Sequence, residues 1–254
     1  MTERAIKTAS AQLFAPIPFD PIPFVPIPFI PQAILFDMDG LMIDSERAIL
    51  QCWRESAEAL SLSVDDALWM RMTGLHDADC DALLRQRMSA HDAQALRTEC
   101  DRRYERRVAD GLPLMPGVFD VLDDIVARGL PRAVVTSTRR ERADRKLAAC
   151  GLARYFEWTI TGSDVAAPKP SPEGYAQAAH RLGVRPERCV VFEDSSYGVR
   201  AALAAGMTPI QVPDLVPPDA ETRALGHRIV ASLREAYALV PVDAERSLLA
   251  DRSR

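Results

Sequence analysis

The eight residues from Ala33 to Gly40, which read Ala-Ile-Leu-Phe-Asp-Met-Asp-Gly, constrain this chain more than any other stretch. An apolar run without polar alternation predicts a strand that is buried on both faces, as in a parallel sheet. Ligands of open α/β sheets bind beyond the carboxyl ends of the strands, where Asp37 and Asp39 are expected. Two carboxylates this close repel each other unless a cation or a proton separates them. The pair therefore predicts a bound metal, a nucleophile with a partner acid, or both.

Composition narrows the class of protein. The chain has 254 residues and a formal net charge of −5, and no basic block stands out, so nucleic acid is not an expected partner. No apolar run reaches the roughly 18 residues needed to cross a bilayer, and the N-terminus lacks a signal core. The five cysteines are widely spaced and form no Cys-x-x-Cys pair, which favours structural thiols in a reducing compartment. We expect a cytoplasmic monomer without membrane contact.

The chain divides into segments of different composition. Residues 1–31 contain three Pro-Ile-Pro-Phe repeats and predict a disordered leader outside the folded domain. Residues 32–44 and 113–240 alternate strand and helix patterns, which predicts an α/β core with a doubly wound parallel, Rossmann-like sheet. Residues 45–112 show only amphipathic helical patterns and predict a small inserted α-helical cap. Residues 241–254 are expected to form a charged tail.

Polar groups also follow other predicted strands of the core. Residues 136–138 read Thr-Ser-Thr and precede a helix, which is typical of an anion cradle and equally of an ordinary helix cap. Lys169 lies between two prolines in a chain whose only lysines are Lys7, Lys146 and Lys169. Glu193 and Asp194 form a second acidic pair at a strand end, although Asp194 could simply cap the next helix. Two acidic pairs at one sheet edge suit Mg²⁺, and the whole set suits phosphoryl transfer.

Four motifs in order make the resemblance to a known family specific. The chain resembles the haloacid dehalogenase superfamily over residues 33–239, in the branch with a helical cap that includes β-phosphoglucomutase and the sugar-phosphate and phosphoglycolate phosphatases. The motifs are Phe36-Asp37-Met-Asp39-Gly-Leu-Met-Ile-Asp-Ser-Glu46, Val135-Thr136-Ser-Thr, Lys169-Pro-Ser-Pro and Val191-Phe-Glu193-Asp194-Ser-Ser-Tyr-Gly-Val-Arg-Ala-Ala.

The resemblance implies a role for each motif residue. Asp37 would attack phosphorus and form an aspartyl-phosphate, and Asp39 would protonate the leaving oxygen and then activate water. Lys169 would neutralise Asp37 and, with Thr136 and Ser137, bind the phosphoryl oxygens. Mg²⁺ would be held by the following groups: the Asp37 side chain, the Asp39 main-chain carbonyl, Glu193 and Asp194.

The expected substrate is a small-molecule phosphate ester, and the sequence of the cap indicates which kind of ester it is. Mutases of the branch carry basic residues in the cap loop, where this chain has an acidic loop with His76, Asp77 and Asp79. This difference favours a phosphatase over a mutase. The cap residues that are candidates to face a sugar or polyol phosphate are Glu46, His76, Asp77 and Asp79. Other cap arginines could substitute, so a β-phosphoglucomutase-like mutase stays an alternative. A non-catalytic binding protein is a third reading, and the intact acidic set disfavours a dehalogenase.

Overall fold

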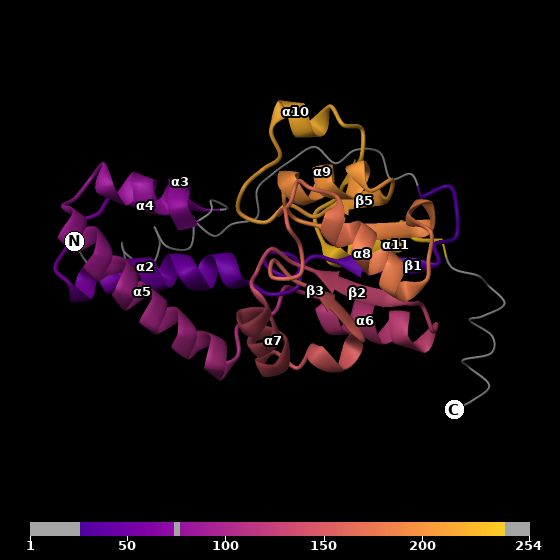
Figure 1. Cartoon of the computed structure of the whole chain (residues 1–254), viewed down its shortest axis with the longest axis horizontal. Coiled ribbons are helices and arrows are strands. Elements are labelled where there is room, and N and C mark those ends of the chain that lie inside the picture. The colour runs from indigo at the N-terminus through magenta and orange to yellow at the C-terminus, as the bar shows by residue number, and fades with distance from the viewer. Residues whose placement is uncertain (1–25, 74–76, 242–254) are drawn as a thin grey trace.

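A single parallel sheet forms the centre of the molecule in the computed structural model, which describes residues 26–73 and 77–241. Its strand order is β3-β2-β1-β4-β5-β6, and every neighbouring pair is parallel (Figure 1). The strands are β1 (Ala33–Phe36), β2 (Arg132–Val135), β3 (Trp158–Ile160), β4 (Cys189–Glu193), β5 (Thr208–Gln211) and β6 (Arg228–Ile229). The predicted doubly wound α/β fold is confirmed.

The direction of chain progress across the sheet reverses at β1. Strand β1 pairs on one side with β2 and on the other with β4, so later strands extend the sheet in opposite directions. Such a reversal opens a crevice at the carboxyl ends of the central strands, because the connections leave to opposite faces. The residues that follow β1, β2 and β4 therefore meet at this crevice.

Alternating side chains of the strands supply two cores, one on each face of the sheet. Ile34 and Phe36 of β1 pack with residues of α6, α7 and α11, whereas Ala33 and Leu35 pack with residues of α8 and α9. These flanking helices are α6 (Val118–Ala127), α7 (Arg140–Ala149), α8 (Glu173–Leu182), α9 (Ser196–Ala204) and α11 (Leu233–Ala238). The short α10 (Ala220–Arg223) and the 3-10 turns η1 (Ala153–Tyr155) and η2 (Pro186–Arg188) complete the core.

Four helices lie beyond one end of the sheet as a cap (Figure 1). They are α2 (Ser45–Ala59), α3 (Asp66–Met72), α4 (Asp77–Arg85) and α5 (Ala90–Asp110). The indole rings of Trp53 and Trp69 stack between α2 and α3 with centroids 6.0 Å apart. The two links between cap and core run side by side, because Ile43 pairs with Leu114 and the Asp44 amide donates to Pro113 O at 2.9 Å. The entrance and exit of the cap are thus tied together.

The last Pro-Ile-Pro-Phe repeat packs on the core, so the expectation of a disordered leader is wrong for residues 26–31. Ile27 is 2% exposed, and its amide donates to Leu239 O at 3.0 Å. The Arg188 guanidinium lies 5.3 Å from the centre of the Phe29 ring. Alternating prolines leave every second amide free to donate, and burial of the isoleucine favours docking. Residues 1–25 and the predicted tail from 242 lie outside the described residues.

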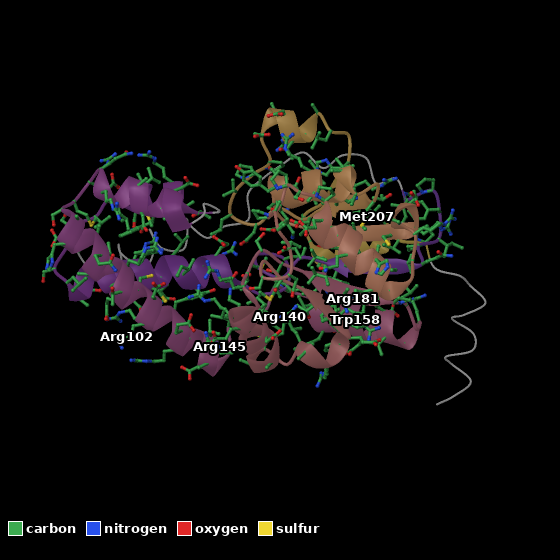
Figure 2. The ribbon with its side chains drawn as sticks, in the orientation of Figure 1. Arg102, Arg140, Arg145, Trp158, Arg181 and Met207 are labelled. Carbon is green, nitrogen blue, oxygen red and sulfur yellow. The ribbon has the colours of Figure 1, made fainter. Side chains whose placement is uncertain are left out.

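A side chain of α8 packs on the ring of Trp158 in the edge strand β3. The Arg181 guanidinium lies 4.9 Å from the centre of the Trp158 ring, and the two labelled side chains are adjacent in Figure 2. The cation–π contact ties α8 to this edge strand, and the outward-facing Thr159 O of β3 accepts from Arg140 Nη2 at 2.6 Å. All five cysteines are free thiols, as predicted. Within the described residues, no helix combines the length and apolarity that crossing a membrane requires.

Candidate active site

Three neighbouring strands bring the predicted residues together at one edge of the sheet. Asp37 follows β1, Thr136 follows β2, and Glu193 ends β4. Asp37 and Thr136 border a cleft of about 610 Å³ between core and cap, and Glu193 lies buried beneath it. The predicted residues among those that line this cleft are Asp37, Asp39, Glu46, Thr136, Ser137, Lys169 and Asp194.

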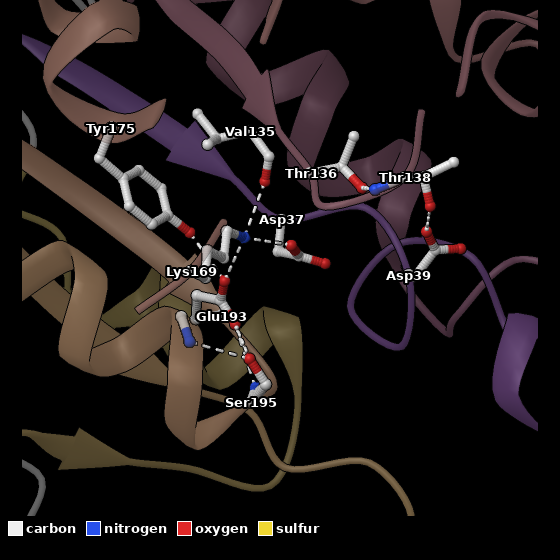
Figure 3. A network of polar contacts seen from close by, with 10 residues as sticks. Asp37, Asp39, Val135, Thr136, Thr138, Lys169, Tyr175, Glu193 and Ser195 are labelled. Carbon is white, nitrogen blue, oxygen red and sulfur yellow. Dashed lines mark hydrogen bonds and ion pairs between the residues drawn. The ribbon is translucent and has the colours of Figure 1, made fainter. Parts of the chain in front are cut away.

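Lys169 is the centre of a buried polar network at the floor of the cleft (Figure 3). Its Nζ lies 2.5 Å from Asp37 Oδ1 and 2.5 Å from Glu193 Oε1, and it donates to Val135 O at 2.9 Å. An ammonium group has three protons and no acceptor, so these three partners use its full capacity. The lysine is therefore held in one orientation, with Asp37 on the cleft side of it.

Glu193 uses all of its acceptor capacity on groups of the protein. Oε1 accepts from Lys169 and from the Tyr175 hydroxyl at 2.8 Å, and Oε2 accepts from the Ser195 amide at 3.0 Å and its hydroxyl at 2.9 Å. A carboxylate has about four acceptor sites, and Glu193 is fully buried. Burial would raise its pKa, but Lys169 and these donors lower it instead. In the structure Glu193 orients Lys169, and its role as a metal ligand stays a prediction.

The carboxylates of Asp37 and Asp194 lack matching positive charge. Burial raises the pKa of Asp37 to about 7, because Lys169 opposes the effect only in part and Glu193 adds to it. Burial, followed by repulsion from Glu193 and Asp37, raises the pKa of Asp194 well above its usual range. Among the described residues, no group donates a hydrogen bond to the Asp194 carboxylate. Two carboxylates short of a counter-charge indicate a site for a cation.

Gly40 lets the loop after β1 approach Asp194. Its φ of +80° belongs to the left-handed region, and a Cβ at this position would lie 2.4 Å from Asp194 Oδ2. The Asp194 carboxylate therefore lies against the loop that carries Asp37 and Asp39. In residues 26–73 and 77–241, no three acidic, histidine or cysteine side chains form a preformed metal cluster. A site of two carboxylates and a carbonyl fits Mg²⁺, which keeps several waters and bonds to few protein groups.

Asp39 is held by residues that the sequence analysis did not assign. Lys146 Nζ lies 2.6 Å from Oδ1, and the Thr138 hydroxyl donates to Oδ2 at 2.7 Å (Figure 3 shows the Thr138 bond). Burial would raise the pKa of Asp39, but the Lys146 ammonium and these hydrogen bonds lower it below the usual value. The sequence could have pointed to Lys146, because it is one of only three lysines and lies on the buried face of α7 with Ala143 and Leu147.

The remaining predicted residues occupy different positions. The Thr136 hydroxyl is buried and accepts from the Thr138 amide at 3.1 Å, whereas Ser137 is exposed in the cleft. Glu46 lies in the first turn of α2 and faces the same cleft. Asp79 is exposed on α4, away from the described lining of the cleft. His76 and the side chain of Asp77 lie outside what the structure describes.

This combination of fold and site matches one protein family. A model of the haloacid dehalogenase-like hydrolase family matches residues 31–206. The match covers more than half of the chain, which therefore belongs to this family.

Similar proteins indicate which kind of enzyme within this family the chain resembles. A phosphorylated carbohydrates phosphatase of Thermotoga maritima is 31% identical over 70% of this chain and 83% of its own. The fructose-1-phosphate phosphatase YqaB of Escherichia coli is 32% identical over 70% and 95%. A solved hydrolase of the same family from Deinococcus radiodurans, with bound phosphate and sodium, superimposes with a TM-score of 0.70 at 32% identity, covering 84% of this chain and 98% of that one. The prediction of a phosphoric monoester hydrolase is confirmed at this level.

Proposed function

We propose that this protein is a Mg²⁺-dependent phosphatase that hydrolyses a sugar or polyol phosphate through an aspartyl-phosphate on Asp37. The observation that carries the proposal is the Asp37 carboxylate at the floor of the cleft, with Lys169 on one side and the unmatched Asp194 nearby. A carboxylate in this position can act as a nucleophile once its charge is balanced.

The chain's own residues supply the steps of the reaction. A carboxylate oxygen of Asp37 forms a bond to phosphorus while the bond to the ester oxygen breaks, and Asp39 gives its proton to that leaving oxygen. Asp39 then takes a proton from water, which attacks the phosphorus of the aspartyl-phosphate and releases Asp37. Lys169 balances charge on Asp37 and the transferred group throughout.

The groups that would hold the proposed Mg²⁺ are the side chains of Asp37 and Asp194 and the main-chain carbonyl of Asp39, and Glu193 remains a further predicted ligand. When bound, the cation supplies the charge that reduces repulsion between a carboxylate and a phosphate dianion. The shortage of positive charge at these two carboxylates supports this assignment. Asp37 must be ionised to attack, and a cation beside it favours the ionised form.

The cleft is compatible with a hydroxyl-rich ester of modest size. Four acidic side chains line it, which are Asp37, Asp39, Glu46 and Asp194, together with four basic ones, which are Arg139, Arg142, Lys146 and Lys169. This lining is neutral overall, so one divalent cation would balance one phosphate dianion. Glu46, which faces the cleft from the cap, can accept hydrogen bonds from substrate hydroxyls. Relatives named for carbohydrate and fructose phosphates support the same class of substrate.

The test is release of inorganic phosphate from a panel of sugar, polyol and glycolate phosphates. We expect release that requires Mg²⁺, stops with EDTA, and falls by about 10³-fold or more in Asp37→Asn, because an amide is a poor nucleophile. Asp79→Asn is the matched control, since Asp79 is exposed away from the cleft, and it should keep full activity.

Other outcomes would point to the alternatives. Conversion of glucose 1-phosphate to glucose 6-phosphate with a bisphosphate primer, without net phosphate release, would identify a mutase. Binding of a phosphate ester without either reaction would identify a binding protein. We also expect a cytoplasmic monomer, which light scattering and cell fractionation test.

A further inference from the structure

Lys146 is a buried lysine that the reaction proposed above does not use. It lies in the middle of α7, its side chain is 4% exposed, and its neighbours in the buried stripe are Ala143 and Leu147. Burying an ammonium group is costly unless it is paired and hydrogen-bonded. Such a residue in a cleft therefore calls for a specific partner.

The partner of Lys146 is the carboxyl group of Asp39. The Nζ atom lies 2.6 Å from Oδ1, and on its other side it lies 5.2 Å from the centre of the Tyr104 ring of α5. The second oxygen, Oδ2, accepts from the Thr138 hydroxyl at 2.7 Å. Both oxygens of Asp39 are thus held by groups of the core, from α7 and from the loop after β2.

We propose that Lys146 is a positioning residue that fixes the Asp39 carboxyl group for proton transfer to the leaving oxygen. This inference rests on the proposed phosphatase function, because it concerns the step in which the ester oxygen departs. Lys146 acts through Asp39 and need not contact the substrate.

The hydrogen-bonding capacities of the Lys146 ammonium and the Thr138 hydroxyl decide which oxygen of Asp39 carries the proton. An ammonium group can only donate, so Oδ1 remains an acceptor in every state of Asp39. The Thr138 hydroxyl can rotate and either donate or accept, so Oδ2 can carry a proton beside it. In the transfer, the O–H bond at Oδ2 breaks and a new O–H bond forms on the ester oxygen as its bond to phosphorus breaks.

The dependence of rate on the leaving group separates this role from two simpler ones. An alkyl ester such as a sugar phosphate needs its leaving oxygen protonated, whereas p-nitrophenolate departs without a proton. A lysine that only attracts the phosphate would affect both esters equally. A lysine that only stabilises the fold would also affect both equally.

The experiment compares Lys146→Met and Lys146→Arg with the wild type. It measures kcat/KM, which covers the chemistry up to departure of the leaving group, for p-nitrophenyl phosphate and for the sugar phosphate that the wild type hydrolyses fastest. We expect Lys146→Met to lose about tenfold or more on the sugar phosphate and less than about threefold on p-nitrophenyl phosphate. Lys146→Arg, which keeps a charged donor, should recover part of the loss.

The control is Arg145→Met, which removes one positive charge from the adjacent position of the same helix. Arg145 is labelled in Figure 2 where α7 meets α5, and its Nη2 lies 2.8 Å from Glu105 Oε2 with half of its side chain exposed. Arg145→Met should leave kcat/KM unchanged for both substrates. Circular dichroism checks folding, and if Lys146→Met does not fold, the same substrate comparison on Lys146→Arg decides, with a smaller loss confined to the sugar phosphate.

Two results would overturn the inference. Equal losses on both esters, or no loss on either, would show that Lys146 does not act through proton transfer. Failure of the proposed function itself is distinct, because the wild type would then release no phosphate from either ester.

Discussion

At the scale of single residues, two of the three lysines are buried at the cleft, and each holds a different acidic residue. Lys169 contacts Asp37 and Glu193, and Lys146 contacts Asp39. The pKa values of the two aspartates of the first motif are therefore shifted in opposite directions: that of Asp37 is raised and that of Asp39 is lowered. In the protein alone these shifts oppose the proposed roles, because a nucleophile must be ionised and an acid must be protonated. A cation bound beside Asp37 would lower the pKa of Asp37, and a phosphate dianion beside Asp39 would raise the pKa of Asp39.

Glu193→Gln tests the role of Glu193 as the anion that orients Lys169. The amide nitrogen of glutamine cannot accept, so a buried donor would lose its partner and the Lys169 charge would be left partly unpaired. We expect the free energy of unfolding to fall by about 3–5 kcal/mol. Urea denaturation measures it.

Glu221→Gln is the matched control, because its carboxylate is 78% exposed and pairs with Arg200 at the surface. This control should change stability by less than about 0.5 kcal/mol. A loss below about 1 kcal/mol in Glu193→Gln would contradict the assigned role.

At the scale of elements, the start of α9 is shaped around Glu193. Ser195 caps the helix by accepting from the Gly198 amide at 3.0 Å, and its own amide and hydroxyl donate to Glu193. Gly198 lies inside the helix, where alanine is intrinsically favoured by about 1 kcal/mol. A Cβ at this position would, however, lie 1.7 Å from Glu193 Oε1. The glycine is required by its neighbour and not by the helix.

Gly198→Ala should therefore destabilise the protein although helix propensity alone predicts the opposite. We expect a loss of about 2 kcal/mol or more, since Glu193 is anchored by four donors and cannot move aside cheaply. Phosphatase activity should fall as well, because Lys169 loses its anchor. Thermal and urea denaturation measure the first effect, and phosphate release the second.

Gly206→Ala provides the comparison for this prediction. Gly206 has a φ of +77° and open space around the Cβ position, so alanine there should carry only the left-handed backbone cost of about 1–2 kcal/mol. Its activity should be unchanged. Wild-type stability or higher in Gly198→Ala would show that α9 can shift away from Glu193.

At the scale of the whole molecule, residues of β5 and of the segment before β6 hold the main chain of Asp194 in place. Gln211 of β5 donates to Asp194 O at 2.9 Å, and its Oε1 pairs with His227 Nε2 at 2.8 Å. His227 precedes β6 and is 5% exposed, with no partner for its Nδ1 among the described residues. Burial lowers the pKa of His227 to about 4. The imidazole is therefore neutral in the folded protein at neutral pH.

This buried histidine makes stability depend on pH. Its pKa in the unfolded chain is near the ordinary 6.5, so below that pH the unfolded state binds the extra proton. His227 therefore does not reduce the free energy of unfolding above about pH 6.5, and it reduces it progressively as the pH falls from 6.5 towards 4. Relative to His227→Gln, the wild type should lose about 2 kcal/mol between pH 7 and pH 5.

Unfolding free energies of the two proteins across this range test the prediction. His180→Gln replaces an exposed histidine of α8 and should follow the wild type at every pH. Parallel curves for wild type and His227→Gln would mean that water reaches the imidazole in the folded state.

The amino-acid sequence alone determined the family, the parallel sheet and the positions of Asp37, Thr136 and Asp194. This was possible because parallel strands bring their carboxyl ends to one edge, so a polar residue after a buried apolar run is placed by the topology. The docking of the third proline repeat was missed, since composition reports the loss of amide donors but not an apolar groove that can receive Ile27.

Only the tertiary structure decided which groups surround each acidic residue. Lys146 and Thr138 reach Asp39 from a helix and a loop that are about a hundred residues away in the chain. Glu193 looks like a metal ligand in the sequence, and the donors that fill its oxygens come from three separate segments. Hydrogen-bond capacity is shared among residues that packing brings together, and for that reason a motif can name an acid without showing what it binds.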